Sequence, residues 1–162
     1  MILLVATVFL CAVMAVAWLV QRALRNAGWV DAFWTFGLGI AGVFVALAAG
    51  QGERRFLVAA LIGGWAIRLG MHIVARSRGA AEDSRYAHFR QEWGADFERR
   101  MFGFLQIQAA AAALLLLPVW LAASSPRALG WPDALAVAVA LVAVLGEGVA
   151  DRQLQAFRAD PG

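Results

Sequence analysis

The sequence of 162 residues contains no lysine, one cysteine and two histidines, and only 15% of its residues are charged. The lone cysteine, Cys11, excludes a disulfide within the chain and any multi-cysteine metal site. The histidines, His72 and His88, lack the His-Glu-x-x-His pattern of common zinc sites, so we expect no metal centre. Soluble domains carry about 25% charged residues, and the shortfall favours a chain that lies in a lipid bilayer.

Every basic residue is an arginine, 14 in all, and the net charge is +3 with a pI of about 10.4. In a soluble protein, such an excess of positive charge could indicate a nucleic-acid partner. The arginines, however, stand at the ends of apolar blocks, where anionic lipid headgroups and membrane topology explain them. We therefore expect a lipid bilayer, and no nucleic acid, as the partner of this chain.

Hydrophobic residues make up 62% of the chain, and the mean hydropathy is +0.70. They gather in blocks of about 20 residues, the length that crosses about 30 Å of hydrocarbon as a helix. The blocks run approximately over 1–20, 29–50, 55–76, 104–123 and 133–153. Because Arg22 and Arg25 follow the first block rather than precede it, we expect that block to be a retained helix rather than a signal peptide. The sequence predicts an all-α, polytopic transmembrane bundle of about five spanning helices, in a single membrane-embedded domain over 1–162.

The one long connection, 77–103, alternates polar and aromatic residues. Tyr86, Phe89, Trp93 and Phe97 recur at spacings of three or four, which gives a helix one apolar face. This pattern predicts an amphipathic helix on the cytoplasmic membrane surface.

The arginines are distributed unequally between the two ends of the predicted helices. One side holds ten, namely Arg22, Arg25, Arg76, Arg78, Arg85, Arg90, Arg99, Arg100, Arg152 and Arg158, and the other holds Arg54, Arg55 and Arg127. Arg68 lies within a span. The positive-inside rule then places the N-terminus outside and the C-terminus in the cytoplasm.

Polar residues inside the spans fall at one level, near the predicted cytoplasmic ends. They are Asp31, Arg68, His72, Gln106, Gln108, Glu147 and Asp151. A charge in lipid costs about 2.5 kcal/mol or more, so such groups normally face partners or a water-filled cavity. A cavity open to the cytosol is therefore expected at this level.

Helical spacing sorts part of this layer into two stripes. One contains Trp65, Arg68, His72 and Arg76, and the other contains Glu147, Asp151 and Arg158. An alternative for the second stripe is a structural ion pair with Arg68 or a frayed helix end. His72 could be a structural histidine, and Asp31 could cap a helix. Gly37, Gly39 and Gly42 permit close packing within the bundle or between chains.

Several motifs resemble a bacterial membrane-protein family of uncharacterised members that is related to the steroid 5-alpha-reductases. They are Val30-Asp31-x-x-Trp34, Trp65-x-x-Arg68-Leu69-Gly70, Glu82-Asp83-x-Arg85-Tyr86-x-x-x-Arg90-x-x-Trp93-Gly94 and Gly146-Glu147-x-x-x-Asp151-x-Gln153-Leu154-x-x-Phe157-Arg158. These matches cover nearly the whole chain in order. The resemblance implies a protein of the bacterial inner membrane with the first five helices of a seven-helix fold.

The resemblance also implies an activity and its residues. Related enzymes bind NADPH from the cytoplasmic side and transfer hydride to a conjugated carbon–carbon double bond of a lipophilic small molecule. The expected NADP(H)-binding residues are Glu147, Asp151 and Arg158. The expected catalytic residues are Asp31, Trp34, Trp65 and Arg68.

The chain departs from the steroid enzymes at two places. Asp31, Trp34 and Trp65 stand where those enzymes polarise a substrate carbonyl with Gln, Glu and Tyr, which disfavours a steroid substrate. The sequence stops at Gly162, before the family's C-terminal cofactor region, so we expect an N-terminal portion with an incomplete cofactor site. A membrane methyltransferase similar to the isoprenylcysteine methyltransferases and a non-catalytic membrane scaffold remain alternative functions.

Overall fold

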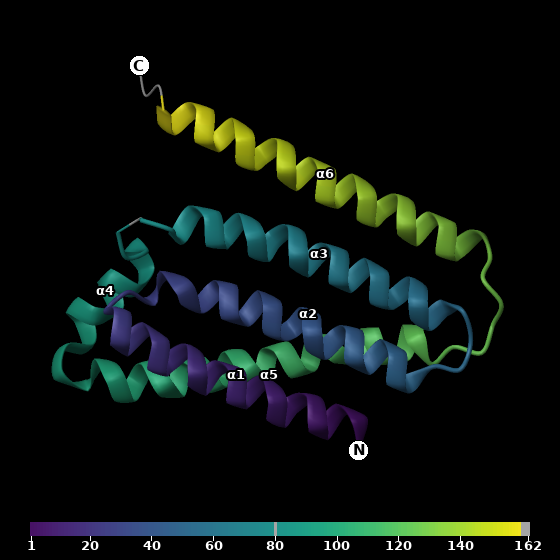
Figure 1. Cartoon of the computed structure of the whole chain (residues 1–162), viewed down its shortest axis with the longest axis horizontal. Coiled ribbons are helices and arrows are strands. Elements are labelled where there is room, and N and C mark those ends of the chain that lie inside the picture. Colours follow the sequence, from purple (N-terminus) through teal and green to yellow (C-terminus); the bar gives the residue numbers. More distant parts are fainter. Residues whose placement is uncertain (80, 160–162) are drawn as a thin grey trace. The chain divides into compact units, whose positions relative to one another are not determined.

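The computed structural model describes residues 1–79 and 81–159, with the side chains of residues 158 and 159 outside the description. The protein is all-helical, with 88% of residues in helices and no strand in the described ranges. The predicted fold class, a transmembrane helix bundle, is confirmed. The helices are α1 (Ile2–Leu24), α2 (Val30–Ala49), α3 (Arg54–Ser77), α4 (Ser84–Trp93), α5 (Phe97–Ala123) and α6 (Trp131–Ala159), as Figure 1 shows.

Among the described residues, five helical segments are long and apolar enough to cross a membrane. They are Ile2–Leu24, Ala27–Ala49, Arg54–Ser77, Ser84–Ala123 and Trp131–Phe157. Their lengths meet the requirement of about 20 residues for a helical span. The chain is thus built as a multi-pass membrane protein, consistent with a lipid bilayer as its surroundings.

The fourth span differs from the predicted one at its beginning. The sequence predicts this span over 104–123, whereas α5 already begins at Phe97 and continues through Pro118. The preceding surface helix is correspondingly short, because Gly94 with φ 49° ends α4 and a 3₁₀ turn, Gly94–Asp96, leads into α5. Glycine accepts this left-handed backbone without a Cβ penalty.

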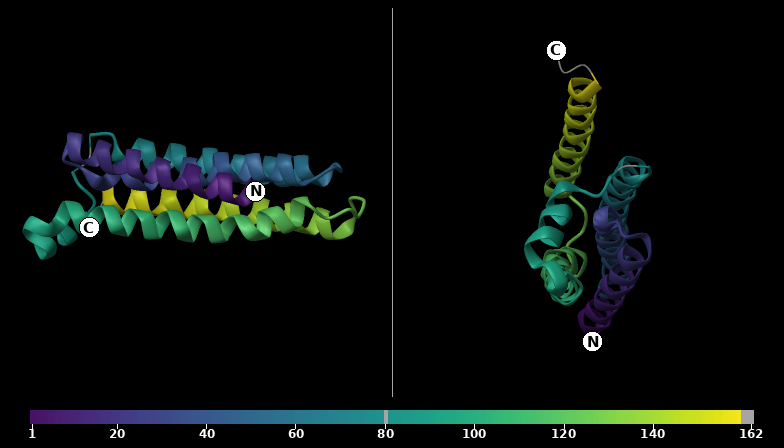
Figure 2. Two further views of the ribbon diagram at one scale, coloured as in Figure 1. Left: turned by 90° about the horizontal axis from the view of Figure 1, so that it is seen from below. Right: turned by 90° about the vertical axis from the view of Figure 1, so that its left-hand side faces the viewer.

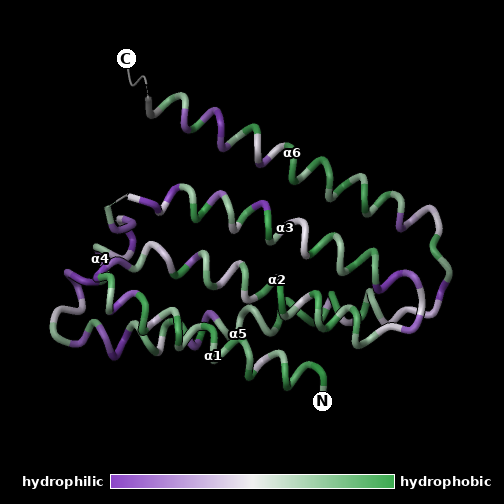
Figure 3. The backbone as a smooth tube through the Cα atoms, viewed as in Figure 1, coloured by the Kyte–Doolittle hydropathy of each residue, from purple (hydrophilic) through white to green (hydrophobic). Residues whose placement is uncertain are grey.

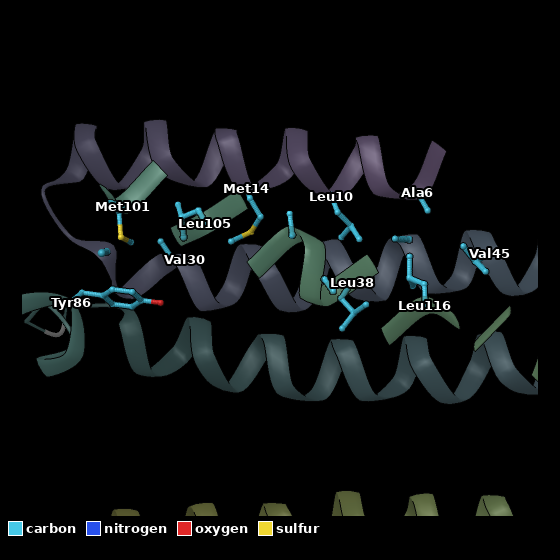
Figure 4. Close-up of a cluster of buried hydrophobic side chains, with 14 of the residues drawn as sticks. Ala6, Leu10, Met14, Val30, Leu38, Val45, Tyr86, Met101, Leu105 and Leu116 are labelled. Atoms are coloured by element: carbon cyan, nitrogen blue, oxygen red, sulfur yellow. The ribbon is translucent and has the colours of Figure 1, made fainter. Parts of the chain in front are cut away.

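The chain divides into two compact units, Met1–Pro126 and Arg127–Gly162, and each is described by itself. In the first unit α2 packs against α1, α3 and α5, and the helices run side by side along the long axis (Figure 2). Their shared core includes Leu10, Met14, Leu38, Met101, Leu105 and Leu116, all close to fully buried (Figure 4). The described part of the second unit beyond its connecting loop is α6.

Glycines bring α2 into close contact with its neighbours inside the chain. A Cβ at Gly39 would overlap the Cβ of Ala66 in α3, and a Cβ at Gly42 would overlap the Ile62 side chain. Small residues at such contacts let helix backbones approach closely in membranes. Of the two alternatives for these glycines, close packing within the bundle is the one that the structure contains.

The aromatic face of α4 packs on the chain's own helices. Tyr86 is only 3% exposed and joins the hydrophobic core, as does Phe97 at the start of α5. Phe89 and Trp93 stack with ring centroids 4.6 Å apart and pack against the same core. Hydrophilic residues are frequent on α4 and around it, while the middle turns of α1 and α2 are mainly hydrophobic (Figure 3). This end of the first unit, which we call the α4 end, holds the candidate site.

Candidate functional site

The turn between α1 and α2 sets the position of Asp31. Asn26 begins a 3₁₀ turn, Ala27–Trp29, and its side-chain oxygen accepts a hydrogen bond of 2.8 Å from the Gly28 N–H. The α-helix α2 then begins at Val30, so Asp31 falls in its first turn. Asn26 therefore acts as the cap, and the Asp31 carboxylate is left to bind other side chains.

The start of α4 sets the position of Arg85. Asp83 is the N-cap residue of α4, and its Oδ1 accepts hydrogen bonds of 3.0 Å from both the backbone N–H and the Nε–H of Arg85. These two bonds fix the direction in which the guanidinium leaves the helix. The same hydrogen bond from the Arg85 side chain holds the pKa of the Asp83 carboxyl below its ordinary value, against the opposing effect of burial.

Asp31 of α2 is bound by two donors from α4. Arg85 Nη2 donates to Asp31 Oδ2 at 2.6 Å, and the Tyr86 hydroxyl donates to Asp31 Oδ1 at 2.8 Å. Each carboxylate oxygen thus has its own donor. Since Arg85 also binds Asp83, one guanidinium connects the beginnings of α2 and α4.

Glu82, the residue before Asp83, is held by a similar set of hydrogen bonds. Arg90 donates to both of its carboxylate oxygens, at 2.9 and 3.1 Å, and the Ala27 N–H donates to Oε1 at 3.0 Å. The Arg90 hydrogen bond lowers the pKa of the Glu82 carboxyl below its ordinary value, although burial acts in the opposite direction. Two adjacent acidic residues therefore fasten the α4 segment to the α1–α2 turn and to α2.

A cavity of about 280 Å³ lies beside the Asp31 pairing. It is lined by Met14, Val30, Asp31, Trp34, Thr35, Leu69, Ile73, Arg85, Tyr86 and Gln108. In Figure 4 the Tyr86 side chain points from α4 into the bundle, in the direction of Val30. Polar groups occupy one part of the wall, and Met14, Leu69 and Ile73 supply an apolar part.

The polar wall is held in place by further hydrogen bonds. The Trp34 indole N–H donates to the Gln108 backbone oxygen at 3.2 Å, and the Thr35 hydroxyl donates to the Asp31 backbone oxygen at 2.8 Å. The N–H groups of Arg85 and of the Gln108 carboxamide are donors suited to a ligand oxygen. A few placed donors in a mainly apolar wall are typical of a small-molecule site.

The predicted catalytic residues separate into two groups. Asp31 and Trp34 line the cavity, and their role in catalysis stays a prediction. On α3 the cavity wall is made by Leu69 and Ile73, while Trp65 packs against the hydrophobic core and Arg68 precedes Leu69 on the helix. A role for Trp65 and Arg68 in catalysis likewise stays a prediction.

The predicted cofactor residues belong to α6 in the second unit. Glu147, Asp151 and Arg158 recur along this helix at offsets of 4 and 11, which at 100° per residue return to within about 40° of one another. The side chain of Arg158 lies outside the described residues. Carboxylates such as Glu147 and Asp151 fit the hydroxyl and amide donors of a dinucleotide, whereas its phosphates require arginine. Glu147 and Asp151 therefore suit the ribose or nicotinamide portion of such a cofactor.

No group of three or more His, Cys, Asp or Glu side chains in the described part of the chain could hold a metal ion. Sequence reasoning placed Gln108 at the level of Asp31 but missed Arg85 and Tyr86 as its neighbours. A signal existed for both. They stand in the Glu82-Asp83-x-Arg85-Tyr86 motif, and Tyr86 is the only tyrosine.

The geometry can be compared with known proteins. A family described as a protein of unknown function (DUF1295) matches residues 17–162. Neither the curated proteins nor the solved structures yield a match. Of the residues that line the 280 Å³ cavity, all but Met14 lie within the matched range.

Proposed function

The chain belongs to the DUF1295 family, and on that premise we propose that it forms the substrate-binding part of an NADPH-dependent membrane reductase. The proposed substrate is a lipophilic small molecule with a carbon–carbon double bond conjugated to a carbonyl group. The observation that carries this proposal is the cavity beside Asp31, in which hydrogen-bond donors face an apolar wall.

The cavity lining suits the needs of conjugate reduction. When a nucleophile attacks the β-carbon of an enone, negative charge develops on the carbonyl oxygen. Donors aimed at that oxygen stabilise the charge, most strongly where water is excluded. The N–H groups of the Arg85 guanidinium and of the Gln108 carboxamide are the donors available here, since the single proton of the Tyr86 hydroxyl is donated to Asp31.

Asp31 has the role of a positioning residue in this proposal. Its two carboxylate oxygens bind Arg85 at 2.6 Å and Tyr86 at 2.8 Å, so the Arg85 guanidinium keeps one orientation before a ligand arrives. Preorganised donors avoid reorganisation during the reaction. The apolar residues Met14, Leu69 and Ile73 receive the hydrocarbon portion of the substrate.

The cofactor part of the proposal rests on the stripe of α6. Glu147 and Asp151 would accept hydrogen bonds from cofactor hydroxyl or amide groups, and Arg158 would pair with a phosphate. NADPH held there would supply the hydride. The link to the steroid 5-alpha-reductases, on which this assignment depends, comes from the resemblance of the motifs.

The proposal is tested with the full-length protein, including any sequence that follows Gly162, purified in dodecyl maltoside. NADPH is mixed with an alkyl-substituted cyclohexenone as the probe substrate, and loss of NADPH absorbance is followed. We expect turnover that falls by about tenfold or more in Tyr86→Phe and Asp31→Asn, as for the loss of one charge-assisted hydrogen bond. The matched control is Glu92→Gln, which removes an exposed carboxylate of α4 that pairs with His88.

Two results would overturn the reductase. If S-adenosylmethionine raises the melting temperature and NADPH does not, the methyltransferase is the better assignment. If neither compound nor the enone changes the melting temperature, and Asp31→Asn only lowers stability, the polar cluster is a structural device of a scaffold protein.

A further inference from the structure

A second cavity, of about 510 Å³, lies at the α4 end of the first unit. It is lined by Gln21, Arg22, Arg25, Glu82, Arg90 and Glu98. None of these residues lines the cavity beside Asp31, so the two spaces are separate. Every residue of this lining carries a charge or an amide. We propose that this cavity binds a phosphate group that carries a hydroxyl or ammonium donor a few atoms away.

Gln21 provides the first indication of a ligand. Gln21 is fully buried at 0% exposure, although it is a polar residue near the end of a mainly apolar helix, α1. Its Nε2 donates to Glu98 Oε2 at 2.9 Å, but its buried Oε1 has no hydrogen-bond partner among the described residues. Buried polar atoms are nearly always hydrogen-bonded, so this oxygen calls for a donor from outside the chain.

The charges around Gln21 provide the second indication. Arg22 pairs with Glu98 at 3.5 Å, and Arg90 pairs with Glu82 at 2.9 Å. Arg25 forms no such pair with any residue that the structure describes. The lining therefore holds three guanidinium groups against two carboxylates, and the surplus positive charge belongs to Arg25. Guanidinium groups bind phosphate by matched hydrogen bonds.

The backbone keeps Arg25 beside the cavity. Arg25 ends α1 in the left-handed conformation, with φ 50°, and its N–H donates to the Gln21 backbone oxygen. A non-glycine residue at positive φ is uncommon and marks a position that the surroundings impose. The Arg25 guanidinium and the unpartnered Oε1 of Gln21 thus belong to residues four positions apart at one helix end.

Neighbouring aromatic residues place the cavity at headgroup depth. The Trp18 indole N–H donates to the Glu98 backbone oxygen at 3.0 Å, and the Arg22 guanidinium lies 4.5 Å from the Trp18 ring centroid. Trp18 also makes an edge contact with Phe102. Tryptophan has an apolar ring and an indole N–H that forms hydrogen bonds, and it is typically found at the membrane–water interface. A phospholipid headgroup at this depth offers the required phosphate.

The donor requirement discriminates between headgroups. The ethanolamine ammonium carries N–H donors for Gln21 Oε1, and the phosphate of the same headgroup would pair with Arg25. Choline has no N–H, so it cannot satisfy Gln21. A soluble phosphate ester such as phosphoethanolamine has the same chemistry without the acyl chains.

The test uses the full chain in dodecyl maltoside, with short-chain phosphatidylethanolamine, matched phosphatidylcholine and phosphoethanolamine as three separate probes. We expect phosphatidylethanolamine to raise the melting temperature saturably, because it binds the folded state. Phosphatidylcholine should give no saturable rise. A saturable rise with phosphoethanolamine at similar concentrations would assign the site to soluble phosphate esters, and a rise with the lipid alone would assign it to headgroups.

Substitutions in the cavity lining test whether phosphatidylethanolamine raises the melting temperature by binding there. Arg25→Gln, at an exposed position, should weaken phosphatidylethanolamine binding by about tenfold or more. Gln21→Leu should remove the preference for ethanolamine over choline. Arg99→Gln is the matched control, because Arg99 is exposed and pairs only locally with Asp96, so binding should be unchanged.

The proposal is overturned if both lipids act equally on the wild type, if no probe raises the melting temperature, or if Arg25→Gln binds phosphatidylethanolamine like the wild type. Asp31→Asn alters the other cavity and should keep the phosphatidylethanolamine effect. Failure of the reductase assay therefore leaves this result intact, and the two proposals can be judged separately.

Discussion

The Tyr86 hydroxyl donates a hydrogen bond of 2.8 Å to Asp31 Oδ1, joining α4 to the first turn of α2 across 55 residues of sequence. Tyr86 is 3% exposed, and the second oxygen of the same carboxylate binds Arg85. The pairing closes the α4 end of the first unit and borders the cavity of about 280 Å³. Stability and ligand binding at this end therefore depend on the same side chains.

Removal of the Tyr86 hydroxyl should destabilise the fold. Tyr86→Phe keeps the ring and its packing but leaves Asp31 Oδ1 without its donor. We expect a loss of about 1–2 kcal/mol in the free energy of unfolding, the range for a hydrogen bond to a charged group in a partly apolar site. Unfolding in mixed micelles, followed by circular dichroism, measures this loss. His88→Ala, an exposed change on α4, should leave the stability close to that of the wild type; equal stability of Tyr86→Phe and the wild type would contradict the prediction.

Acid should weaken the attachment of α4. The pKa values of Glu82 and Asp83 are lowered in the folded state by hydrogen bonds from Arg90 and Arg85. A carboxyl with a lowered folded pKa adds stability that is present above its unfolded pKa and is lost as the pH falls through the folded value. The melting temperature in detergent should therefore decrease between about pH 5 and about pH 2.

The double variant Glu82→Gln, Asp83→Asn supplies the comparison for this pH effect. It should be less stable than the wild type at neutral pH, and its melting temperature should change less on acidification. Parallel pH curves for the two proteins would show that other groups cause the acid effect.

The contact between α2 and α3 should not tolerate a methyl group at Gly39. A Cβ there would overlap the Cβ of Ala66, which is attached directly to the α3 backbone and cannot rotate away. Overpacking of this kind typically costs about 1–3 kcal/mol. Gly39→Ala should thus lower the melting temperature. The control is Gly64→Ala on α3, where a Cβ would meet no atom within 4 Å, so this variant should be neutral or slightly more stable.

The orientation of the chain can be tested by thiol labelling. Arginines are more numerous at the α4 end, so we propose that this end faces the cytoplasm. In a Cys11→Ala background, Gly52→Cys should react with a membrane-impermeant maleimide in intact bacterial cells. His88→Cys should react only after permeabilisation. Both positions are exposed, and the reverse pattern of labelling would invert the topology.

Hydropathy predicted the spanning helices well, because about 20 apolar residues in a row have few alternatives to a membrane helix. The beginning of α5 could not be found in this way. Arg99 and Arg100 lower the local hydropathy, yet both are exposed on a helix whose other side buries Phe97 and Met101. Only packing reveals that these polar turns belong to the spanning helix.

The hydrogen-bond partners of Asp31 could likewise not be predicted from the sequence pattern. The sequence does place Asp31 near one end of the bundle, because Asp31 stands at the start of a predicted spanning helix. Its pairing with Arg85 depends on how the turn at Asp83 directs α4, and with 14 arginines in the chain no spacing rule selects this one. The aromatic periodicity correctly put Tyr86 on an apolar helix face, but it could not show that this face packs on the bundle.

The separation of 54 residues between Asp31 and Arg85 has a consequence for biogenesis. A ribosome adding about 5–20 residues per second delivers Arg85 roughly 3–11 s after Asp31. During this interval α2 is inserted with an acidic residue whose final partners do not yet exist. The nascent α1–α2 hairpin must keep that carboxylate near water or near the insertion machinery. Translational pausing around residues 81–86 would lengthen this exposed stage, and the rate of synthesis there becomes a determinant of how much protein matures.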